Sequence, residues 1–341
     1  MIKNIILLII SILFVVLLAE GAVRIFGLAP GVEKISAKGL VFSTNPDLRY
    51  TLKPDSILES LNTRININKD GYRGKAYNFN KSDGEVIRIL CLGDSIGLGL
   101  YLKDEETFCS QLETRLNNEK LFGKRWEVIN FGVPGYNTIN EIELLKVKGL
   151  KYGPDLVVLQ YCFNDHGNKS DLDTRLKDAL VEHHRLIGLL MNPALKIISR
   201  SKLFLLCAVR FKSLKIDLES KRRWWIPGNY VYDGDFFVKG LEEFKLLSEE
   251  YDFQTLVVLF PYFEKKDRFS EYSWSYERVI GQCIEFGTPF INLLDYFKKY
   301  YPEDKPYPKF HLDKVHPTGY GNSVATDAIF HYLSTNPDKF Q

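Results

Sequence analysis

The sequence predicts an α/β protein in which a parallel five-stranded sheet is sandwiched between helices. After residue 85, short apolar segments rich in β-branched residues alternate with longer segments of helical periodicity. Strands separated by helices form βαβ units, and the strands of such units run parallel. The composition agrees, because 45% hydrophobic and 26% charged residues are ordinary for a globular protein. The net charge of +2 gives no indication of nucleic-acid binding.

The expected elements begin with a strand at residues 86–92, which is mostly apolar and ends at Gly93, as is typical of a buried parallel strand. Ligands of parallel sheets bind beyond the carboxyl ends of the strands, so the residues that follow each strand are where chemistry is expected. The later elements are a helix at 107–117, a strand at 126–131, a helix at 138–152, a strand at 156–161, a helix at 236–250, a strand at 255–260, a helix at 276–286, a strand at 290–293 and a closing helix after Pro317.

The N-terminal residues 1–28 predict a membrane anchor. An apolar run over residues 5–19 is broken only by Ser11, and the helix is expected to continue through Glu20 and Arg24. Lys3 then favours a cytoplasmic N-terminus, which places the rest of the chain on the extracytoplasmic side. The alternative is a signal peptide that is cleaved, so that the protein is secreted.

Two further segments flank or interrupt the predicted sheet. Residues 29–84 are expected to form an N-terminal extension that packs on the main domain, with short strands at 39–43 and 64–68. Residues 85–335 form the predicted main domain, interrupted at about 167–232 by a helical and basic insertion. This insertion suits a lid or a membrane-facing surface, or else an amphipathic helix with a solvated basic face.

The five cysteines predict neither a disulfide framework nor a metal site, because their number is odd and no short paired spacing occurs. Cys91 and Cys162 lie in apolar, strand-like segments and are expected to be small buried residues.

Ser95 is the candidate nucleophile. It lies in the tripeptide Gly-Asp-Ser at residues 93–95, where the first strand turns into a helix. Alone, this tripeptide is a weak signal, since it is more often a turn or a helix cap. A serine hydroxyl attacks only when a neighbouring base takes its proton, so a histidine that is oriented by a third group is required elsewhere in the chain.

Asp313 and His316 supply these partners, because their spacing allows the two side chains to touch directly. A carboxylate that accepts the Nδ1 proton leaves Nε2 of the histidine as the base. Pro317 suits the first turn of the final helix. Acyl transfer also needs donors for the developing oxyanion, and these are expected from the glycine-bearing turn at residues 130–136 and from Asn164.

Together these segments resemble the four sequence blocks of the SGNH hydrolase superfamily, also called GDSL-type esterases and lipases. The blocks are Ser95 in Gly-Asp-Ser, Gly135 in Asn-x-Gly-x-x-Gly, Asn164 in Asn-Asp, and Asp313-x-x-His316, in the order of the family and over about residues 86–334. The resemblance implies a three-layer α/β/α sandwich of the flavodoxin-like type, and a triad that needs neither cofactor nor metal. It also implies an oxyanion hole made of the Ser95 and Gly135 N–H groups and the Asn164 amide.

Two structural expectations accompany the resemblance. Asn130 and Asp165 are expected to shape their turns rather than to act in catalysis. Residues 67–74 resemble a stretch that precedes the catalytic domain in membrane-anchored bacterial members of the superfamily.

The predicted function is a serine esterase that cleaves an ester-linked acyl or acetyl group from an extracytoplasmic carbohydrate or lipid. An O-acyltransferase would use the same residues. The nucleophile elbow of α/β-hydrolases also fits Gly-x-Ser-x-Gly, but its serine follows a mid-sheet strand. A non-catalytic binding module and a metal-dependent phosphoesterase are the remaining alternatives. The latter would use Asp94, Asp165, His166, Asp313 and His316.

Overall fold

The computed structural model describes residues 2–25, 39–43, 45, 47, 48, 50–60, 63–81, 85–162, 165, 203, 236–261, 269–300 and 315–340. The chain forms two compact units. One consists of Met1–Ala37 and Thr174–Tyr230, and the other of Lys38–Asp173 and Val231–Gln341. The second unit holds the strands of the described residues together with Ser95 and His316.

The second unit contains the parallel five-stranded sheet that the sequence predicts. Its spatial order is β6, β5, β7, β8 and β9, and every neighbouring pair is parallel. Gly93 pairs with Gly132, so the first two strands of the sheet end at the same level. The bounds are β5 Val86–Gly93, β6 Arg125–Gly132, β7 Leu156–Tyr161, β8 Gln254–Leu259 and β9 Phe290–Asn292.

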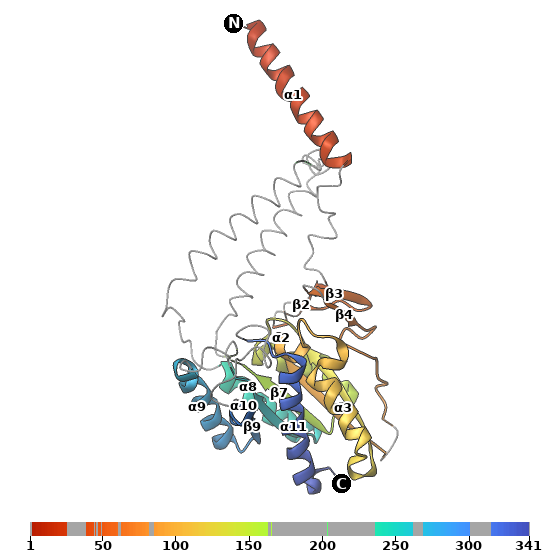
Figure 1. Cartoon of the computed structure of the whole chain (residues 1–341), viewed down its shortest axis with the longest axis vertical. Coiled ribbons are helices and arrows are strands. Elements are labelled where there is room, and N and C mark those ends of the chain that lie inside the picture. Colours follow the sequence, from red (N-terminus) through yellow and green to blue (C-terminus); the bar gives the residue numbers. More distant parts are fainter. Residues whose placement is uncertain are drawn as a thin grey trace. The chain divides into compact units, whose positions relative to one another are not determined.

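Helices cover both faces of this sheet, so the expected three-layer α/β/α arrangement is present. Figure 1 shows α3 and α11 beside each other, and these two helices are in contact. The first helical layer consists of α3 (Phe108–Asn118), α10 (Leu293–Tyr300) and α11 (Gly319–Thr335). The second consists of α4 (Thr138–Val147), α8 (Phe236–Tyr251) and α9 (Phe269–Phe286). Short 3-10 helices occur at Asp104–Glu106, Leu121–Gly123, Gly149–Tyr152 and Pro337–Lys339.

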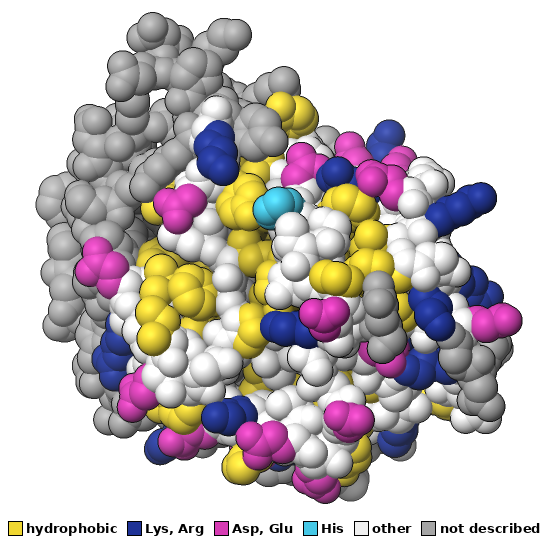
Figure 2. Space-filling model, turned by 90° about the horizontal axis from the view of Figure 1, so that it is seen from below, with side chains coloured by type: hydrophobic (Ala, Val, Ile, Leu, Met, Phe, Trp, Pro, Cys, Tyr) yellow, Lys and Arg dark blue, Asp and Glu magenta, His cyan; other side chains and the backbone are white. Residues whose placement is uncertain are grey.

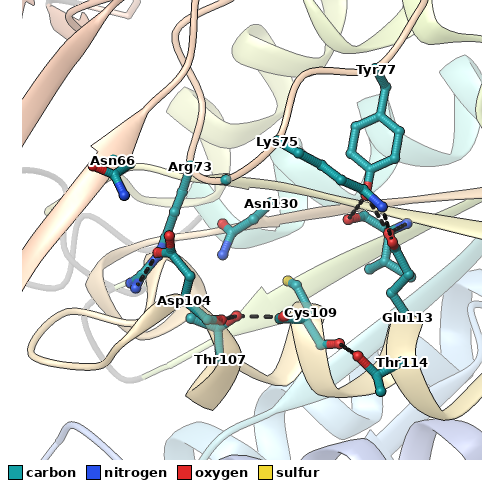
Figure 3. Close-up of a pocket in the computed structure, with 13 residues that line it drawn as sticks. Asn66, Arg73, Lys75, Tyr77, Asp104, Thr107, Cys109, Glu113, Thr114 and Asn130 are labelled. Carbon is teal, nitrogen blue, oxygen red and sulfur yellow. Dashed lines mark hydrogen bonds and ion pairs between the residues drawn. The ribbon is translucent and has the colours of Figure 1, made fainter.

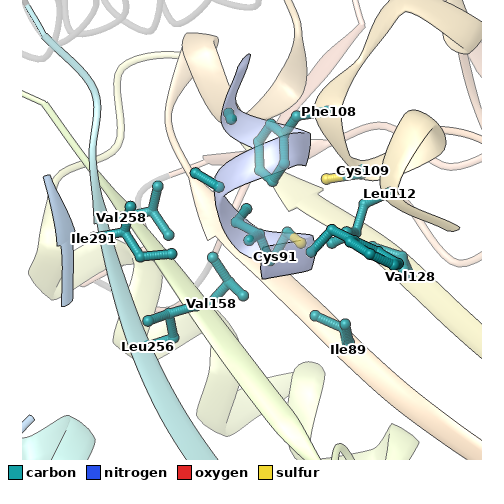
Figure 4. Packing of buried hydrophobic residues seen from close by; sticks show 14 of the residues in the cluster. Ile89, Cys91, Phe108, Cys109, Leu112, Val128, Val158, Leu256, Val258 and Ile291 are labelled. Carbon is teal, nitrogen blue, oxygen red and sulfur yellow. The ribbon is translucent and has the colours of Figure 1, made fainter. Parts of the chain in front are cut away.

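The core follows the two-residue period of the strands. Alternate strand side chains point to the face that carries α3, and there they pack against Phe108 and Leu112 (Figure 4). The strand residues of this cluster include Ile89, Cys91, Val128, Val158, Leu256, Val258 and Ile291. The intervening residues are buried on the opposite face, which explains why these strands are apolar without alternation. Four cysteines are buried thiols, namely Cys91, Cys109, Cys162 and Cys283, whereas Cys207 lies outside the described residues.

Three elements differ from the prediction. The segment expected to form one helix at 138–152 forms α4 and then a separate short 3-10 helix, because the backbone leaves the helical conformation at Lys148. Helix α9 begins at Phe269, earlier than residue 276. Helix α10 was not predicted, since it follows β9 without a turn and its pattern covers only eight residues.

The N-terminal extension forms two antiparallel hairpins within the larger unit. In the first, β1 (Leu40–Phe42) pairs with β2 (Tyr50–Leu52), and in the second, β3 (Ser56–Ser60) pairs with β4 (Thr63–Ile67). The sequence predicted β1 and β4 but missed their partners, whose segments contain too few apolar residues to stand out. Residue 73 then forms a bridge with Asn130, at the edge of the main sheet.

Helix α1 (Ile2–Ile25) occupies the segment for which an anchor was expected. No helix among the described residues combines the length and apolar character that a membrane span requires, so the spanning helix predicted over 1–28 is not found. The uninterrupted apolar stretch ends before Glu20, which pairs with Arg24 in the last turns at 2.6 Å, and it is shorter than the roughly 20 residues of a spanning helix. The insertion expected at about 167–232 lies, apart from residue 203, outside the described residues.

Charged side chains of both signs are mixed on the surface. The face in Figure 2 carries interspersed basic and acidic side chains with small hydrophobic areas between them, in keeping with the net charge of +2.

A buried ion pair joins β5 to β6 near the amino end of the sheet. The Arg88 side chain is 1% exposed, and its Nε and Nη2 donate to Glu127 Oε2 at 2.9 and 2.6 Å. Its Nη1 donates to the carbonyls of Phe79 and Tyr152. Truncation of Arg88 would therefore leave Glu127 partly buried with Arg125 as its remaining charge partner.

We expect Arg88→Ala to lower the free energy of unfolding by about 3–5 kcal/mol, because the change leaves a buried carboxylate without its main partner. Urea denaturation followed by circular dichroism measures this loss. The double variant Arg88→Met with Glu127→Leu removes both charges and should recover most of the stability. A single variant as stable as the wild type would contradict the prediction.

Candidate active site

Ser95 is the first residue of the short helix α2 (Ser95–Leu98), directly beyond the carboxyl end of β5. Asp94 caps this helix, because its Oδ1 accepts the Ile96 N–H at 2.7 Å. Strand β5 lies between β6 and β7, and successive connections leave it toward opposite edges of the sheet. Such a switch point is where parallel sheets open a crevice for ligands. Ser95 therefore stands at the position that the topology favours for binding.

The turn that carries Ser95 has almost no space around its backbone. Gln160 projects from β7 beneath it, and its Oε1 accepts the Asp94 and Gly97 N–H groups at 3.1 and 2.9 Å. A Cβ atom on Gly93 would lie 2.4 Å from that same oxygen. On the other side, a Cβ atom on Gly132 would lie 2.1 Å from the backbone nitrogen of Leu98. Both strand-end glycines are therefore required by the close approach of neighbouring chains.

Asn130 fixes the same turn from β6. Its Nδ2 donates to the Gly97 carbonyl at 2.9 Å, and its Oδ1 accepts the Gly132 N–H at 2.9 Å. The side chain is buried and is occupied by backbone groups, in agreement with the structural role that the sequence indicated.

His316 reaches Ser95 from 221 residues away in the chain: its Nε2 lies 2.9 Å from Ser95 Oγ. The following helix α11 begins at Gly319, and the Thr318 hydroxyl caps it by accepting the Gly321 N–H at 3.1 Å. Pro317 thus precedes the cap and does not lie in the first turn as predicted, because the threonine hydroxyl takes the capping position.

Helix α3 holds the segment around His316 in place. Asn322, which is fully buried, accepts the Phe108 N–H at 3.0 Å with its Oδ1 and donates to the Thr318 carbonyl at 3.0 Å. Gln111 of α3 donates to the Gly319 carbonyl at 2.9 Å. These bonds bind the start of α11 to the start of α3, so the backbone next to His316 is fixed relative to the sheet.

A shallow depression lies at Ser95 and His316 and is lined also by Leu100 and Leu102. The Tyr101 ring contacts the His316 ring edge to face, with ring centroids 5.1 Å apart and planes at 78°. Tyr101 has a φ of 71°, a left-handed conformation that is uncommon for an aromatic residue and that requires its neighbours to hold it.

Two backbone N–H groups, one in the turn after β5 and one in the turn after β6, lack acceptors among the described residues although neighbouring N–H groups are bonded. The N–H groups of Asp94, Ile96 and Gly97 all donate to side-chain oxygens, whereas the Ser95 N–H has no acceptor among the described residues. Gly135 has a φ of 77° in the turn after β6, and its buried N–H also lacks an acceptor there. Such open donors are what an oxyanion site requires.

Two predicted site residues, Asn164 and Asp313, lie outside the described residues, as does His166. Their roles remain predictions. Among the residues that the structure describes, no group of three His, Cys, Asp or Glu side chains is arranged to hold a metal ion.

Three buried carboxyl groups lie beneath the site. Asp165 accepts the Cys162 N–H at 2.8 Å and the Thr138 hydroxyl at 3.2 Å, which joins the end of β7 to the start of α4. Burial raises the pKa of Asp165 well above its usual range, and the nearby Asp94 adds to the effect. The pKa of Glu141 is raised for the same reasons, with Asp165 and Asp94 as its neighbours. Neither oxygen of Glu141 has a hydrogen-bond partner in the described part of the chain.

Sequence reasoning missed the side chains that support the site. Gln160 interrupts an otherwise apolar strand, and this irregularity was the available signal for it. Cys162, expected to be a plain buried residue, donates its Sγ–H to Asp94 Oδ2 at 3.3 Å. Asn322 and Tyr101 have no sequence signal, because their contacts depend on how distant segments meet.

A comparison with models of protein families identifies the family of this chain. The model of the GDSL-like Lipase/Acylhydrolase family matches residues 91–324, more than half of the chain. A search of curated proteins finds no match.

The chain is also similar to several solved structures. One is a variant of an acetyl xylan esterase from Geobacillus stearothermophilus, with a TM-score of 0.48, 15% identity, and coverage of 73% of this chain and 94% of that chain. Another is an alpha/beta hydrolase enzyme from the metagenome of Lake Arreo, Spain, with a TM-score of 0.45, 13% identity, and coverage of 72% and 94%. A third is TesA, with a TM-score of 0.43, 15% identity, and coverage of 73% and 98%. These similarities are too distant to inform on substrate.

The buried Glu141 makes stability depend on pH. Its pKa is raised on folding, so the folded chain retains a proton that the unfolded chain releases above its ordinary pKa of 4.5. The stability is complete below that pH and is lost as the pH rises toward the folded pKa. We expect Glu141→Gln, which has no proton to release, to be more stable than the wild type at pH 7.

This gain should disappear near pH 4, which urea denaturation at the two pH values would measure. Glu242→Gln, a change on an exposed side chain of α8, serves as the control. A pH-independent difference between Glu141→Gln and the wild type would contradict the prediction.

Proposed function

This chain belongs to the GDSL-like lipase/acylhydrolase family and is a carboxylic ester hydrolase, and we propose that Ser95 is its nucleophile, His316 its proton carrier and Asp313 the group that orients the histidine. The observation that carries this proposal is the contact of Ser95 Oγ with His316 Nε2 at 2.9 Å. A distance of this length is what proton transfer from the hydroxyl to the ring requires.

In the proposed reaction, Ser95 Oγ bonds to the carbonyl carbon of the ester while its proton passes to His316 Nε2. Collapse of the tetrahedral intermediate breaks the carbon–oxygen bond to the alcohol, which leaves with the proton from Nε2. A water molecule then gives a proton to His316 Nε2 and attacks the carbonyl carbon of the acyl-enzyme. Collapse of this second intermediate breaks the bond between that carbon and Ser95 Oγ, which takes the proton back from Nε2. The products are the carboxylic acid and the restored serine.

The negative charge that develops on the carbonyl oxygen needs donors that are already in place. We assign the backbone N–H groups of Ser95 and Gly135 to this role. This assignment is supported because neither N–H group has an acceptor among the described residues, whereas the neighbouring Ile96 and Gly97 N–H groups are bonded. The side-chain amide of Asn164 is the third proposed donor, on its position after β7 in the sequence.

Asp313 completes the proposed triad through its spacing from His316. A carboxylate three residues before the histidine can accept the Nδ1 proton, which leaves Nε2 free to act as the base toward Ser95.

The proposed substrate is an ester-linked acyl or acetyl group on an extracytoplasmic carbohydrate or lipid. This location is supported by the apolar segment of residues 5–19, in which Leu7, Phe14 and Leu17 of helix α1 are each more than half exposed. We propose that α1 directs the hydrolase domain across the membrane, either as a retained segment or as a signal that is removed.

We expect Ser95→Ala and His316→Ala each to lower kcat for a short-chain aryl ester by at least about 1000-fold, because each change removes a member of one catalytic unit. A fluorophosphonate probe should label the wild type on the peptide that contains Ser95 and should not label Ser95→Ala.

Ser334→Ala, near the end of α11, is the matched control and should keep full activity and labelling. Labelling on another peptide, or undiminished turnover by Ser95→Ala, would overturn the assignment. Addition of sugar alcohols to the assay separates hydrolysis from transfer, because transfer yields a new ester in place of the free acid.

For the location, we expect protease added to intact spheroplasts to digest the hydrolase domain while cytoplasmic marker proteins survive. Recovery of activity in the washed membrane fraction indicates a retained segment, and recovery in the medium indicates a removed signal. Full protection from the protease would contradict the proposed location.

A further inference from the structure

Arg73 joins the N-terminal extension to the turn that carries Ser95. Its guanidinium is buried, and Nη1 donates to the carbonyls of Leu98 and Gly99 at 2.9 and 2.7 Å. Its Nη2 donates to the Leu102 carbonyl at 2.7 Å. These three carbonyls belong to the segment that follows the nucleophile, so one side chain holds that segment from below.

All five N–H donors of this guanidinium have acceptors. Nε donates to Asp104 Oδ1 at 2.8 Å, and Nη2 lies 2.8 Å from the same oxygen. Figure 3 shows Arg73 extended toward Asp104, with the ion pair marked. Burial lowers the pKa of Arg73 and the Asp104 carboxylate opposes this effect, so the side chain stays charged. A saturated, charged guanidinium holds its acceptors in one arrangement.

The carbonyl groups at the end of α2 therefore have fixed partners. Asn130 donates to the Gly97 carbonyl, and Arg73 donates to the carbonyls of Leu98 and Gly99. Gly99 ends the helix in a left-handed conformation with a φ of 77°, and a Cβ atom there would meet Arg73 at 3.2 Å and Thr107 at 2.5 Å. The conformation of the turn and the position of Arg73 thus depend on each other.

A second contact from the extension reaches the His316 side of the site. The Thr63 hydroxyl of β4 donates to the Tyr101 carbonyl at 3.0 Å. The Tyr101 ring in turn packs edge to face on His316. The extension therefore holds the segment of residues 98–104 at several points, and this segment follows the turn of the proposed nucleophile and contacts the proposed base through Tyr101.

Arg73 also lines a cavity of about 540 Å³ between the extension, α3 and β6, shown in Figure 3. Apart from Arg73 and its ion-pair partner, the charged groups of this cavity are Lys75 and Glu113, which pair with each other. Glu113 also accepts from the Tyr77 hydroxyl and from the Val128 N–H at 2.8 Å. Since the Arg73 donors are fully used, they are not available to a ligand in the cavity. The cavity nevertheless gives small solutes a route to the guanidinium.

We propose that Arg73 is a positioning residue for ester cleavage, which holds residues 98–102 so that Ser95, its backbone N–H and His316 keep their reactive arrangement. This inference rests on the proposed function, in which Ser95 is the nucleophile. Arg73 does not touch the substrate, so its effect falls on kcat and on the reactivity of Ser95 rather than on KM.

The test compares Arg73→Ala and Arg73→Lys with the wild-type full chain. We expect kcat for an aryl ester to fall by about 100-fold in Arg73→Ala, because small displacements of reacting groups have effects of this size. KM should stay within about twofold, and the rate of fluorophosphonate labelling should fall in parallel with kcat. Arg73→Lys keeps the charge without the planar five-donor group and should recover little of the loss.

The matched control is Arg88→Ala, which removes an equally buried, hydrogen-bonded arginine from the opposite end of β5. Its folded fraction should keep the wild-type kcat and labelling rate although the protein is less stable. Millimolar guanidinium ion, which can enter through the cavity, should restore part of the activity of Arg73→Ala. The same concentration of sodium ion should restore none, and Arg88→Ala should not respond.

Wild-type kcat and labelling rate in both folded Arg73 variants would overturn the proposal. Failure of both variants to fold would do the same, because it would assign Arg73 to folding alone. The wild type provides the separate test of the proposed function: if its Ser95 peptide is not labelled, the nucleophile assignment fails whatever the Arg73 variants do.

Discussion

The close packing of the turn at residues 93–99 against the ends of β6 and β7 is the constraint on which the site depends. Gly93 and Gly132 pair across the two strands, and neither position has room for a Cβ atom. The backbone of α2 can therefore approach the neighbouring strand closely enough for Asn130 and Gln160 to bond its polar groups. A short helix of one turn cannot satisfy its own backbone, so these side chains decide where Ser95 lies.

In the turns near Ser95, most backbone polar groups have hydrogen-bond partners, and a few N–H groups do not. Below the turn, carbonyl and N–H groups are bonded to Gln160, Asn130 and Arg73. The N–H groups of Ser95 and Gly135, in contrast, have no acceptor among the described residues. An open N–H donor on the proposed nucleophile suits the proposed oxyanion site, where the bound ester supplies the missing acceptor.

Residues 38–84 of the N-terminal extension belong to the same compact unit as the sheet, and they contribute to the site from outside the matched family region. The match to the family model begins at residue 91, whereas Arg73 and Thr63 precede it. Both contact the segment between Ser95 and Asp104. The extension is thus joined to the site by a buried charge and not merely by apolar packing. A resemblance limited to the catalytic blocks does not reveal this dependence.

The five strands of the main sheet and their parallel arrangement could be predicted from the sequence, because a buried parallel strand must be apolar on both faces and this leaves a readable pattern at residues 86–92 and 156–161. Residue type and strand-end position also indicated Ser95 and His316. The contact of these two side chains at 2.9 Å, and the support from Arg73, Gln160 and Asn322, became visible only in the folded chain. The reason is physical: periodicity records which side of an element is buried, whereas a hydrogen bond between distant segments depends on packing that no local pattern encodes.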